Sequence, residues 1–252
     1  MVASYPNVEI RHILNVPVHA MTMSQVVDLL DETIVNRQHL QIGVVNAAKV
    51  VNMDRDPKLR EDVLSSDLIL ADGAAVVWAS RILKQPLPER IAGIDLMYEL
   101  FCKGNEKGYK IFCLGATEEV SAEIERRVHS DYPGVNLVGR HHGYFSPEEE
   151  EKIAEQIAAA QPDILFVAMT SPKKEHFLAR WSSVMNVPIT HGVGGSFDVM
   201  AGKVDRAPEL WQKLGLEWLY RVKQEPRRLW KRYFVTNTLF VWMVFKAKFL
   251  GK

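Results

Sequence analysis

Short apolar runs alternate with helical patterns along most of the chain, and this alternation constrains the fold more than any other feature. The clearest unit begins at Tyr109, where YKIFCLG predicts a buried strand and EEVSAEIERRV, shortly after it, predicts a helix. DILFVAM, at 163–169, is another continuous apolar run, which is typical of a strand covered on both faces. Strand and helix alternating at this spacing predict an α/β fold with a mostly parallel sheet flanked by helices.

The segments that directly follow the predicted strands are the candidate site, because open parallel sheets bind ligands at the carboxyl ends of their strands. Asn46 follows the apolar run 42–45, and Asp72 follows the run 68–70. A carboxylate at such a position can act as a base. Asp72-Gly73 is also a common turn pair, so a purely structural turn stays open as an alternative.

Two further segments have features of an anion site. If Ser171 caps a helix, Lys174 lies in its first turn, where free N–H groups and the lysine can bind a diphosphate. The glycine-rich segment GVGGSFD, at 192–198, allows close approach of the backbone to a ligand or to another strand. It matches neither GxGxxG nor the P-loop pattern. An ordinary capped helix and a tight strand-to-helix connection are the structural alternatives.

The composition excludes several classes of protein. With 47% hydrophobic and 25% charged residues, the chain is neither disordered nor fibrous. Two cysteines, Cys102 and Cys113, do not suffice for a disulfide framework or a cysteine-built zinc site. Because His141-His142 lacks further ligands at metal-binding spacing, no metal is predicted. The N-terminus lacks the apolar core of a signal peptide, so we expect a cytoplasmic protein.

The end of the chain is basic, whereas the rest is acidic. Residues 203–252 hold 12 Lys and Arg against four Asp and Glu, a net charge of +8, and the other 202 residues carry a net charge of −8. Aromatic residues are frequent from Trp218 onward, and the uncharged run 233–245 has 13 residues, fewer than the ~20 needed to span a membrane. This pattern favours an amphipathic helix lying on a membrane surface. No nucleic-acid-binding motif accompanies the cations, so no nucleic acid partner is expected.

Three segments resemble one known family. PERIAGIDL (88–96), GVGGSFDVMAGKVDRAP (192–208) and GLEWLYRV (215–222) are similar to the WecG/TagA/CpsF glycosyltransferases, which form glycosyltransferase family 26. The resemblance covers nearly the whole chain. It implies a Rossmann-like catalytic core at 1–207 and a basic, amphipathic, membrane-associating helical appendage at 208–252. The implied reaction is an inverting, metal-independent transfer from a UDP-sugar to a polyprenyl-diphosphate-linked sugar at the cytoplasmic membrane face, with no cofactor.

The resemblance also implies roles for individual residues. Asp72 would be the general base, and Arg90 and Asn46 would belong to the catalytic set with it. The residues implied to bind substrate come from the helix start, the glycine loop, the basic segment after it and the appendage; they are Lys174, Gly194, Gly195, Asp198, Arg206, Arg221 and Arg228.

Two positions depart from the family's usual pattern. Val44 stands where threonine is usual, and Lys174 stands where glutamine is usual. These departures, and a likeness to the xanthan-type lipid-linked glucosyltransferases, favour glucose as the transferred sugar, in exopolysaccharide assembly. Transfer of N-acetylmannosamine, or of its uronic acid, to polyprenyl-diphosphate-N-acetylglucosamine is the alternative.

Two other classes of function are possible for an α/β chain with a basic tail, and the sequence disfavours both. A nucleotide-dependent oxidoreductase is disfavoured because no GxGxxG opens a helix. A membrane-tethered nucleotide-binding module without catalysis is disfavoured because a carboxylate and two anion sites all follow strands. The sequence leaves the oligomeric state open, and a homo-oligomer is compatible with it.

Overall fold

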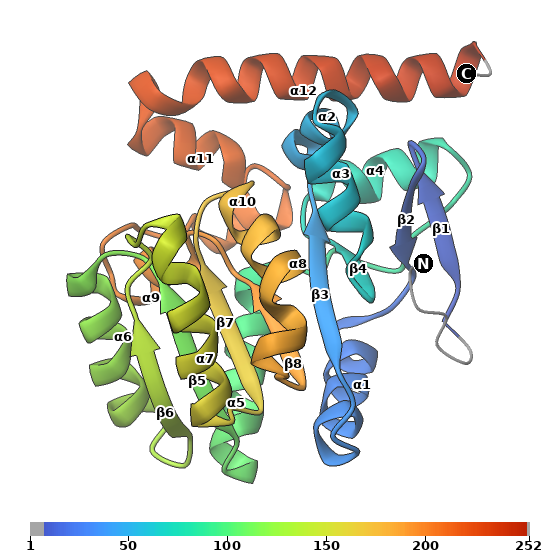
Figure 1. Cartoon of the computed structure of the whole chain (residues 1–252). Helices are drawn as coiled ribbons and strands as arrows, with labels where there is room; N and C mark the ends of the chain where they lie inside the picture. The colour runs from blue at the N-terminus through green and yellow to red at the C-terminus, as the bar shows by residue number, and fades with distance from the viewer. Residues whose placement is uncertain (1–7, 251–252) are drawn as a thin grey trace.

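The computed structural model describes residues 8–250, and a six-stranded parallel sheet forms its centre (Figure 1). The strand order is β4-β3-β8-β7-β5-β6, and every pair of neighbours is parallel. The strands are β3 (Leu40–Val45), β4 (Leu68–Ala71), β5 (Lys110–Gly115), β6 (Asn136–His141), β7 (Ile164–Ala168) and β8 (Ile189–Gly192). This confirms the predicted parallel α/β sheet. A separate antiparallel hairpin, β1 (Ile10–Ile13) and β2 (Val16–His19), precedes it.

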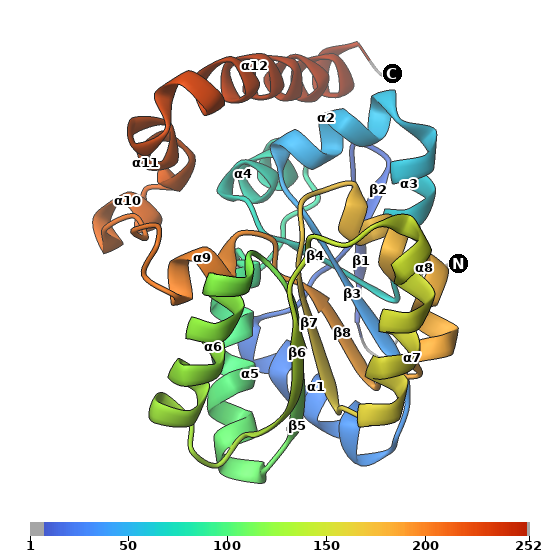
Figure 2. The ribbon, with the colours of Figure 1, turned by 60° about the vertical axis from the view of Figure 1, so that its left-hand side comes forward.

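Helices cover both faces of the sheet because alternate strand residues point to opposite sides (Figure 2). In β5, Ile111 and Cys113 face the layer of α1 (Met23–Val35), α5 (Gly93–Lys107) and α6 (Glu118–Asp131). Phe112 and Leu114 face α7 (Glu150–Ala160) and α8 (Lys173–Met185) on the other side. Near β4, the helices α2 (Ala47–Arg55), α3 (Pro57–Leu64) and α4 (Ala74–Ile82) pack with the hairpin.

Two short helical turns adjoin these layers. The 3₁₀ turn η1 (Pro147–Glu149) precedes α7, and Ser146 forms a capping box with Glu149 there. The five-residue α9 (Ser196–Met200) follows β8 directly and continues the glycine-rich segment. The chain then leaves the sheet and enters the basic region.

Three helices follow the predicted boundary at 207/208: α10 (Glu209–Lys213), α11 (Glu217–Gln224) and α12 (Pro226–Phe249). The 24-residue α12 lies across α2 and α4 and buries Phe240 and Val244 in their hydrophobic cluster (Figure 1). Its opposite side exposes large apolar side chains, among them Trp242 and Phe245. No helix within residues 8–250 is long and apolar enough to cross a membrane. The division into a core and an appendage at this boundary stays a prediction.

Candidate active site

Asp72 and Asn46 lie side by side at the carboxyl ends of two neighbouring strands. Asp72 directly follows β4, and Asn46 directly follows β3 and is the N-cap of α2. The amide Nδ2 of Asn46 lies 3.4 Å from Oδ2 of Asp72. A Cβ atom at Gly73 would lie 2.9 Å from the Cβ of Asn46, so this close approach requires glycine. The structure therefore brings together two of the three predicted catalytic residues.

The Asp72 carboxylate also caps a distant helix. The N–H of Gly93, the first residue of α5, donates a 2.8 Å hydrogen bond to Oδ1 of Asp72. The N-cap of α5 is Ala92, whose side chain cannot serve this role, so Asp72 pairs one of the donors that a helix N-terminus leaves free. A helix N-terminus stabilises negative charge. Asp72 itself is half-buried. It is thus a carboxylate of fixed orientation that solvent can still reach.

Arg90, the third predicted catalytic residue, belongs to a network of ion pairs that we call the latch, formed by Arg90, Asp95, Arg206 and Glu217. Arg90 pairs with Glu217 and lies 3.5 Å from Asp95 through Nη2 and Oδ2. Arg206 pairs with Asp95, and its Nε lies 3.7 Å from Oε1 of Glu217. Because Glu217 starts α11 and Asp95 lies in α5, the latch joins the sheet-forming part of the chain to its C-terminal helices.

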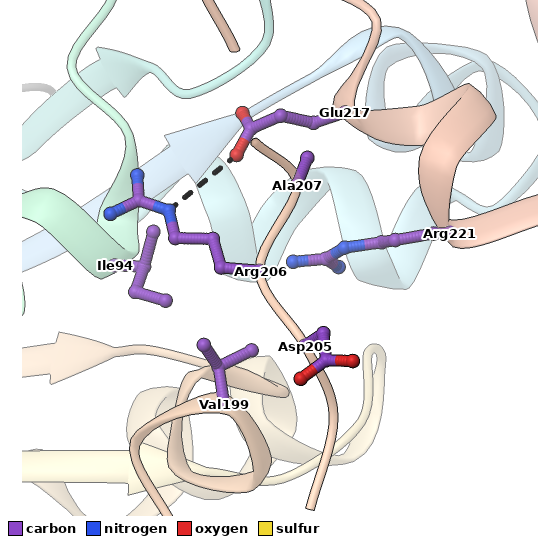
Figure 3. Close-up of a pocket in the computed structure, with 7 residues that line it drawn as sticks. All are labelled: Ile94, Val199, Asp205, Arg206, Ala207, Glu217 and Arg221. Atoms are coloured by element: carbon purple, nitrogen blue, oxygen red, sulfur yellow. Dashed lines mark ion pairs between the residues drawn. The ribbon is translucent and has the colours of Figure 1, made fainter. Parts of the chain in front are cut away.

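A pocket opens beside the latch, next to the N-terminus of α5 (Figure 3). It is lined by Ile94, Val199, Asp205, Arg206, Ala207, Glu217 and Arg221. Arg221 reaches into it from α11, so two of the arginines predicted to bind substrate meet here. Arg228, the third, has a largely exposed side chain and pairs with Glu225 on its own helix.

Lys174 lies in the first turn of α8, as predicted, but the N-cap of that helix is not the predicted Ser171. We expected Ser171 to cap the helix and Lys174 to be its third residue, but α8 begins at Lys173 with Pro172 as N-cap. The predicted serine cap is wrong because the N–H of Lys174 bonds to the carbonyl of Thr170, 3.2 Å away, in a backbone turn. The side chain is buried, and its Nζ lies 2.9 Å from Oε1 of Glu175.

Glu175 also binds a second buried lysine, and we call Lys49, Lys174 and Glu175 the lysine–glutamate triad. The Nζ of Lys49 lies 2.7 Å from the same Oε1 of Glu175. Burial and the nearby charge of Lys174 lower the pKa of Lys49 to about 8. Burial raises the pKa of Glu175, but Lys49 and Lys174 outweigh this effect and lower it to about 2. The triad therefore places up to one excess positive charge beneath the end of β8.

Sequence reasoning did not identify Lys49 or Glu175. One signal was available for Lys49, which lies three residues after Asn46, in the first turn of the helix that follows β3. A lysine in a first helical turn is electrostatically unfavourable unless an anion lies nearby. Lys174 lies in the first turn of α8 in the same way, so the two lysines together indicate a shared anionic partner.

The glycine loop connects β8 to α9. Gly194 adopts the left-handed conformation, with φ of +55°, which favours glycine. A Cβ atom there would meet nothing within 4 Å in the described part of the chain, so this side of the loop faces open space. A Cβ at Gly195 would lie 3.9 Å from Oδ2 of Asp198, which places these two predicted residues together. Their role in nucleotide binding stays a prediction.

Comparison with known proteins places this geometry in a family. Residues 11–252 match the glycosyl transferase WecG/TagA/CpsF family. The chain belongs to this family. This glycosyltransferase is also 39% identical over 178 residues to the N-acetylglucosaminyldiphosphoundecaprenol N-acetyl-beta-D-mannosaminyltransferase of Bacillus spizizenii strain W23. That alignment covers 71% of this chain and 68% of the relative.

A glycosyltransferase must stabilise the negative charge of its leaving group, and fixed cations or N–H dipoles are one means of doing so. The cations that this glycosyltransferase offers in the described part of the candidate site include the latch arginines and the two lysines of the lysine–glutamate triad. Within residues 8–250, no group of three or more His, Cys, Asp or Glu side chains is arranged to hold a metal ion. Whether the reaction is independent of metal stays a prediction.

Proposed function

We propose that this glycosyltransferase moves N-acetylmannosamine from a UDP-sugar to polyprenyl-diphosphate-linked N-acetylglucosamine. The family and the named activity of the Bacillus relative support this assignment. The sequence favoured glucose as the donor sugar, from the likeness to xanthan-type enzymes and from Val44 and Lys174. The relative favours the alternative, N-acetylmannosamine, so glucose becomes the second choice.

The observation that carries the proposal is the orientation of Asp72 by two hydrogen-bond donors, the Asn46 amide at the end of β3 and the Gly93 N–H at the start of α5. In the proposed reaction, Asp72 accepts the proton of an acceptor hydroxyl. The acceptor oxygen then forms a bond to C1 of the donor sugar, while the bond from C1 to the phosphate oxygen breaks. The diphosphate leaves with the bonding electron pair, and attack from the opposite face inverts the anomeric centre. Asn46, beside Asp72, helps to fix the carboxylate.

The departing UDP requires positive charge on its side of the site. The lysine–glutamate triad supplies up to one excess positive charge, and the N-termini of α2 and α8 add the positive ends of two helix dipoles. Lys174 therefore supports the diphosphate through the field of a buried cluster, rather than as a free side chain. The diphosphate of the lipid acceptor is assigned to the pocket that Arg206 and Arg221 line.

The membrane-facing element in this proposal is α12. Its outer side exposes large apolar residues in a row: Trp230, Phe234, Val241, Trp242, Phe245 and Phe249. Basic residues lie near both of its ends, and each cation near an anionic membrane contributes about 1 kcal/mol of binding. An anionic lipid surface and apolar acyl chains fit this combination. Through α12 the protein would thus bind to the membrane surface that carries its lipid-linked acceptor.

A transfer assay tests the function. The full chain is incubated with polyprenyl-diphosphate-N-acetylglucosamine in vesicles and with labelled UDP-N-acetylmannosamine, UDP-N-acetylglucosamine, UDP-glucose or UDP-N-acetylmannosaminuronic acid. We expect label in the lipid fraction from UDP-N-acetylmannosamine, and its loss when Asp72 is replaced by Asn. Transfer from UDP-glucose instead would restore the glucose assignment. Binding of UDP without transfer from any donor would favour a nucleotide-binding module, and a preference for NAD over UDP in thermal shift would favour an oxidoreductase.

A further inference from the structure

His191 is a histidine in the middle of the apolar sheet, and it contacts the residue that holds Asp72. It lies in β8 between β3 and β7, and its side chain is fully buried. Its Nε2 lies 3.0 Å from the carbonyl oxygen of Gly93. The N–H of the same Gly93 donates to Oδ1 of Asp72. A chain of two hydrogen bonds therefore runs from His191 through Gly93 to Asp72.

The acceptor fixes the tautomer of His191. A carbonyl oxygen can only accept, so Nε2 must carry the proton and donate it to Gly93. Burial lowers the pKa of His191 to about 4, so the ring is neutral near neutral pH. In this tautomer Nδ1 is an acceptor, and it is buried without a hydrogen-bond partner among the described residues.

Packing alone does not account for a histidine at this position. A buried polar atom without a partner destabilises the fold, and an apolar side chain of similar size would avoid that cost. What histidine offers here, and leucine does not, is a donor aimed at Gly93. The His191 ring packs against Phe166 in a T-shaped arrangement, with 6.2 Å between the ring centres, which limits the freedom of the imidazole to turn away.

Gly93 needs such a support. It begins α5, and the preceding Ala92 caps the helix with no side-chain hydrogen bond within the described residues. Movement of this helix start would carry the Gly93 N–H away from Oδ1 of Asp72 and would rotate the carboxylate. A displacement of 1 Å in a reacting group can lower a rate by about 100-fold.

We propose that His191 is a positioning residue for Asp72, acting through Gly93. Its Nε2–H fixes the first residue of α5, and the N–H of that residue fixes the carboxylate that accepts the acceptor proton. The inference rests on the proposed role of Asp72 as the base. It assigns no contact between His191 and substrate, so it concerns the rate of transfer and not the binding of the donor.

Three variants test this relationship. His191→Leu removes the donor, and His191→Gln keeps an amide N–H at the approximate place of Nε2. Thr190→Val is the matched control, because Thr190 is the preceding residue of β8, is equally buried, and has a hydroxyl without a hydrogen-bond partner within residues 8–250. We expect His191→Leu to lower kcat by about 10-fold or more, with the Kd for UDP within twofold of wild type. His191→Gln should recover most of the loss, and Thr190→Val should retain wild-type kcat.

Two comparisons separate this inference from the proposed function. In the Asp72→Asn background, adding His191→Leu should cause no further loss, because the positioned group is already gone. Unchanged kcat in His191→Leu, or equal losses in the Leu and Gln variants, would overturn the inference while leaving Asp72 as the base. Full activity of Asp72→Asn alone would overturn the proposed function instead.

A spectroscopic measurement decides the question even if His191→Leu does not fold. In wild-type protein with ¹⁵N-labelled histidine, NMR should show His191 protonated at Nε2 and unprotonated at Nδ1. Asp72→Asn should shift these resonances, whereas the exposed His129 should not respond. Protonation at Nδ1 would leave the Gly93 carbonyl without its donor and would contradict the proposed chain of hydrogen bonds.

Discussion

Lys49 and Glu175 meet in the interior with Nζ 2.7 Å from Oε1, although 126 residues separate them in the sequence. Both side chains are more than nine-tenths buried. Lys174 reaches the same carboxylate oxygen, so two cations share one anion. Such an arrangement makes the carboxylate far more important to stability than either lysine.

The lysine–glutamate triad should respond asymmetrically to substitution. Glu175→Gln leaves two buried lysines without a counter-charge, and loss of a buried ionic partner costs about 3–5 kcal/mol. Lys49→Met removes the excess cation and leaves the Lys174–Glu175 pair. It should therefore lower the free energy of unfolding much less than Glu175→Gln does. Urea unfolding of both variants checks this order. Equal destabilisation would mean that the two lysines do not share Glu175 in solution.

Acid should destabilise the protein partly through His191. Burial lowers its folded pKa to about 4, below the ordinary value of 6.5 that we assign to the unfolded chain. Between these values the unfolded state binds the proton and the folded state does not, so stability falls as pH falls from 6.5 towards 4. The expected loss is about 3 kcal/mol. Denaturant unfolding at the two pH values should show this loss in wild type and in His129→Gln, and a smaller one in His191→Gln.

Replacement of the proposed base should separate turnover from binding. Asp72→Asn keeps the shape of the side chain but removes its ability to accept a proton, so turnover should fall by about 100-fold or more. The Kd for UDP, measured by calorimetry, should change little. Asp54→Asn is the control, since Asp54 is exposed near the end of α2. Turnover near that of wild type in Asp72→Asn would remove Asp72 from the mechanism.

The latch should control how firmly the C-terminal helices are held. Glu217→Gln weakens the pairing with Arg90 and Arg206, which contributes roughly 1 kcal/mol for partly exposed groups. Limited proteolysis in the segment 201–208 should therefore become a few-fold faster. Glu209→Gln should not change it, because that side chain is largely exposed and pairs only weakly with Lys213. Identical digestion of all three proteins would argue against the latch.

Membrane binding should depend on the outer side of α12. Burial of an apolar side chain contributes about 1.5–3 kcal/mol, so Trp242→Ser with Phe245→Ser should lower partitioning into anionic vesicles at least tenfold. Val35→Ser is the control, as Val35 is an exposed apolar residue at the end of α1, and the helix α1 lies far from α12 (Figure 1). High salt should reduce flotation further, because it screens the cations. Flotation unaffected by the double substitution would refute this surface.

The parallel sheet could be predicted because most of its strands contain a short apolar run and are followed by a helical pattern, although β6 (NLVGRH) is only partly apolar. The hairpin β1–β2 was not predicted, since its strands have only four residues each. Its turn, Leu14-Asn15, adopts positive φ at both positions without the glycine that usually signals such a turn.

Some residues of the candidate site could be predicted from their local sequence, and others could not because their partners are distant in the sequence. Asp72 and Asn46 could be proposed because each directly follows a strand, and neighbouring parallel strands end at the same edge. Lys49, Glu175 and His191 gain their importance from partners far away in the sequence, which no local pattern encodes. The start of α8 was misplaced because a backbone bond to Thr170 replaced the expected serine cap.

The contact between α12 and α2 connects the proposed membrane-facing helix to the candidate active site. Asn46 caps α2, and α12 packs on that same helix. The axes of two packed helices lie about 8–10 Å apart. Under the proposed docking of α12 on the bilayer, this packing holds Asn46, and Asp72 beside it, about one helix layer away from the lipid surface. The lipid-linked acceptor would then have to extend out of the bilayer to bring its hydroxyl to Asp72.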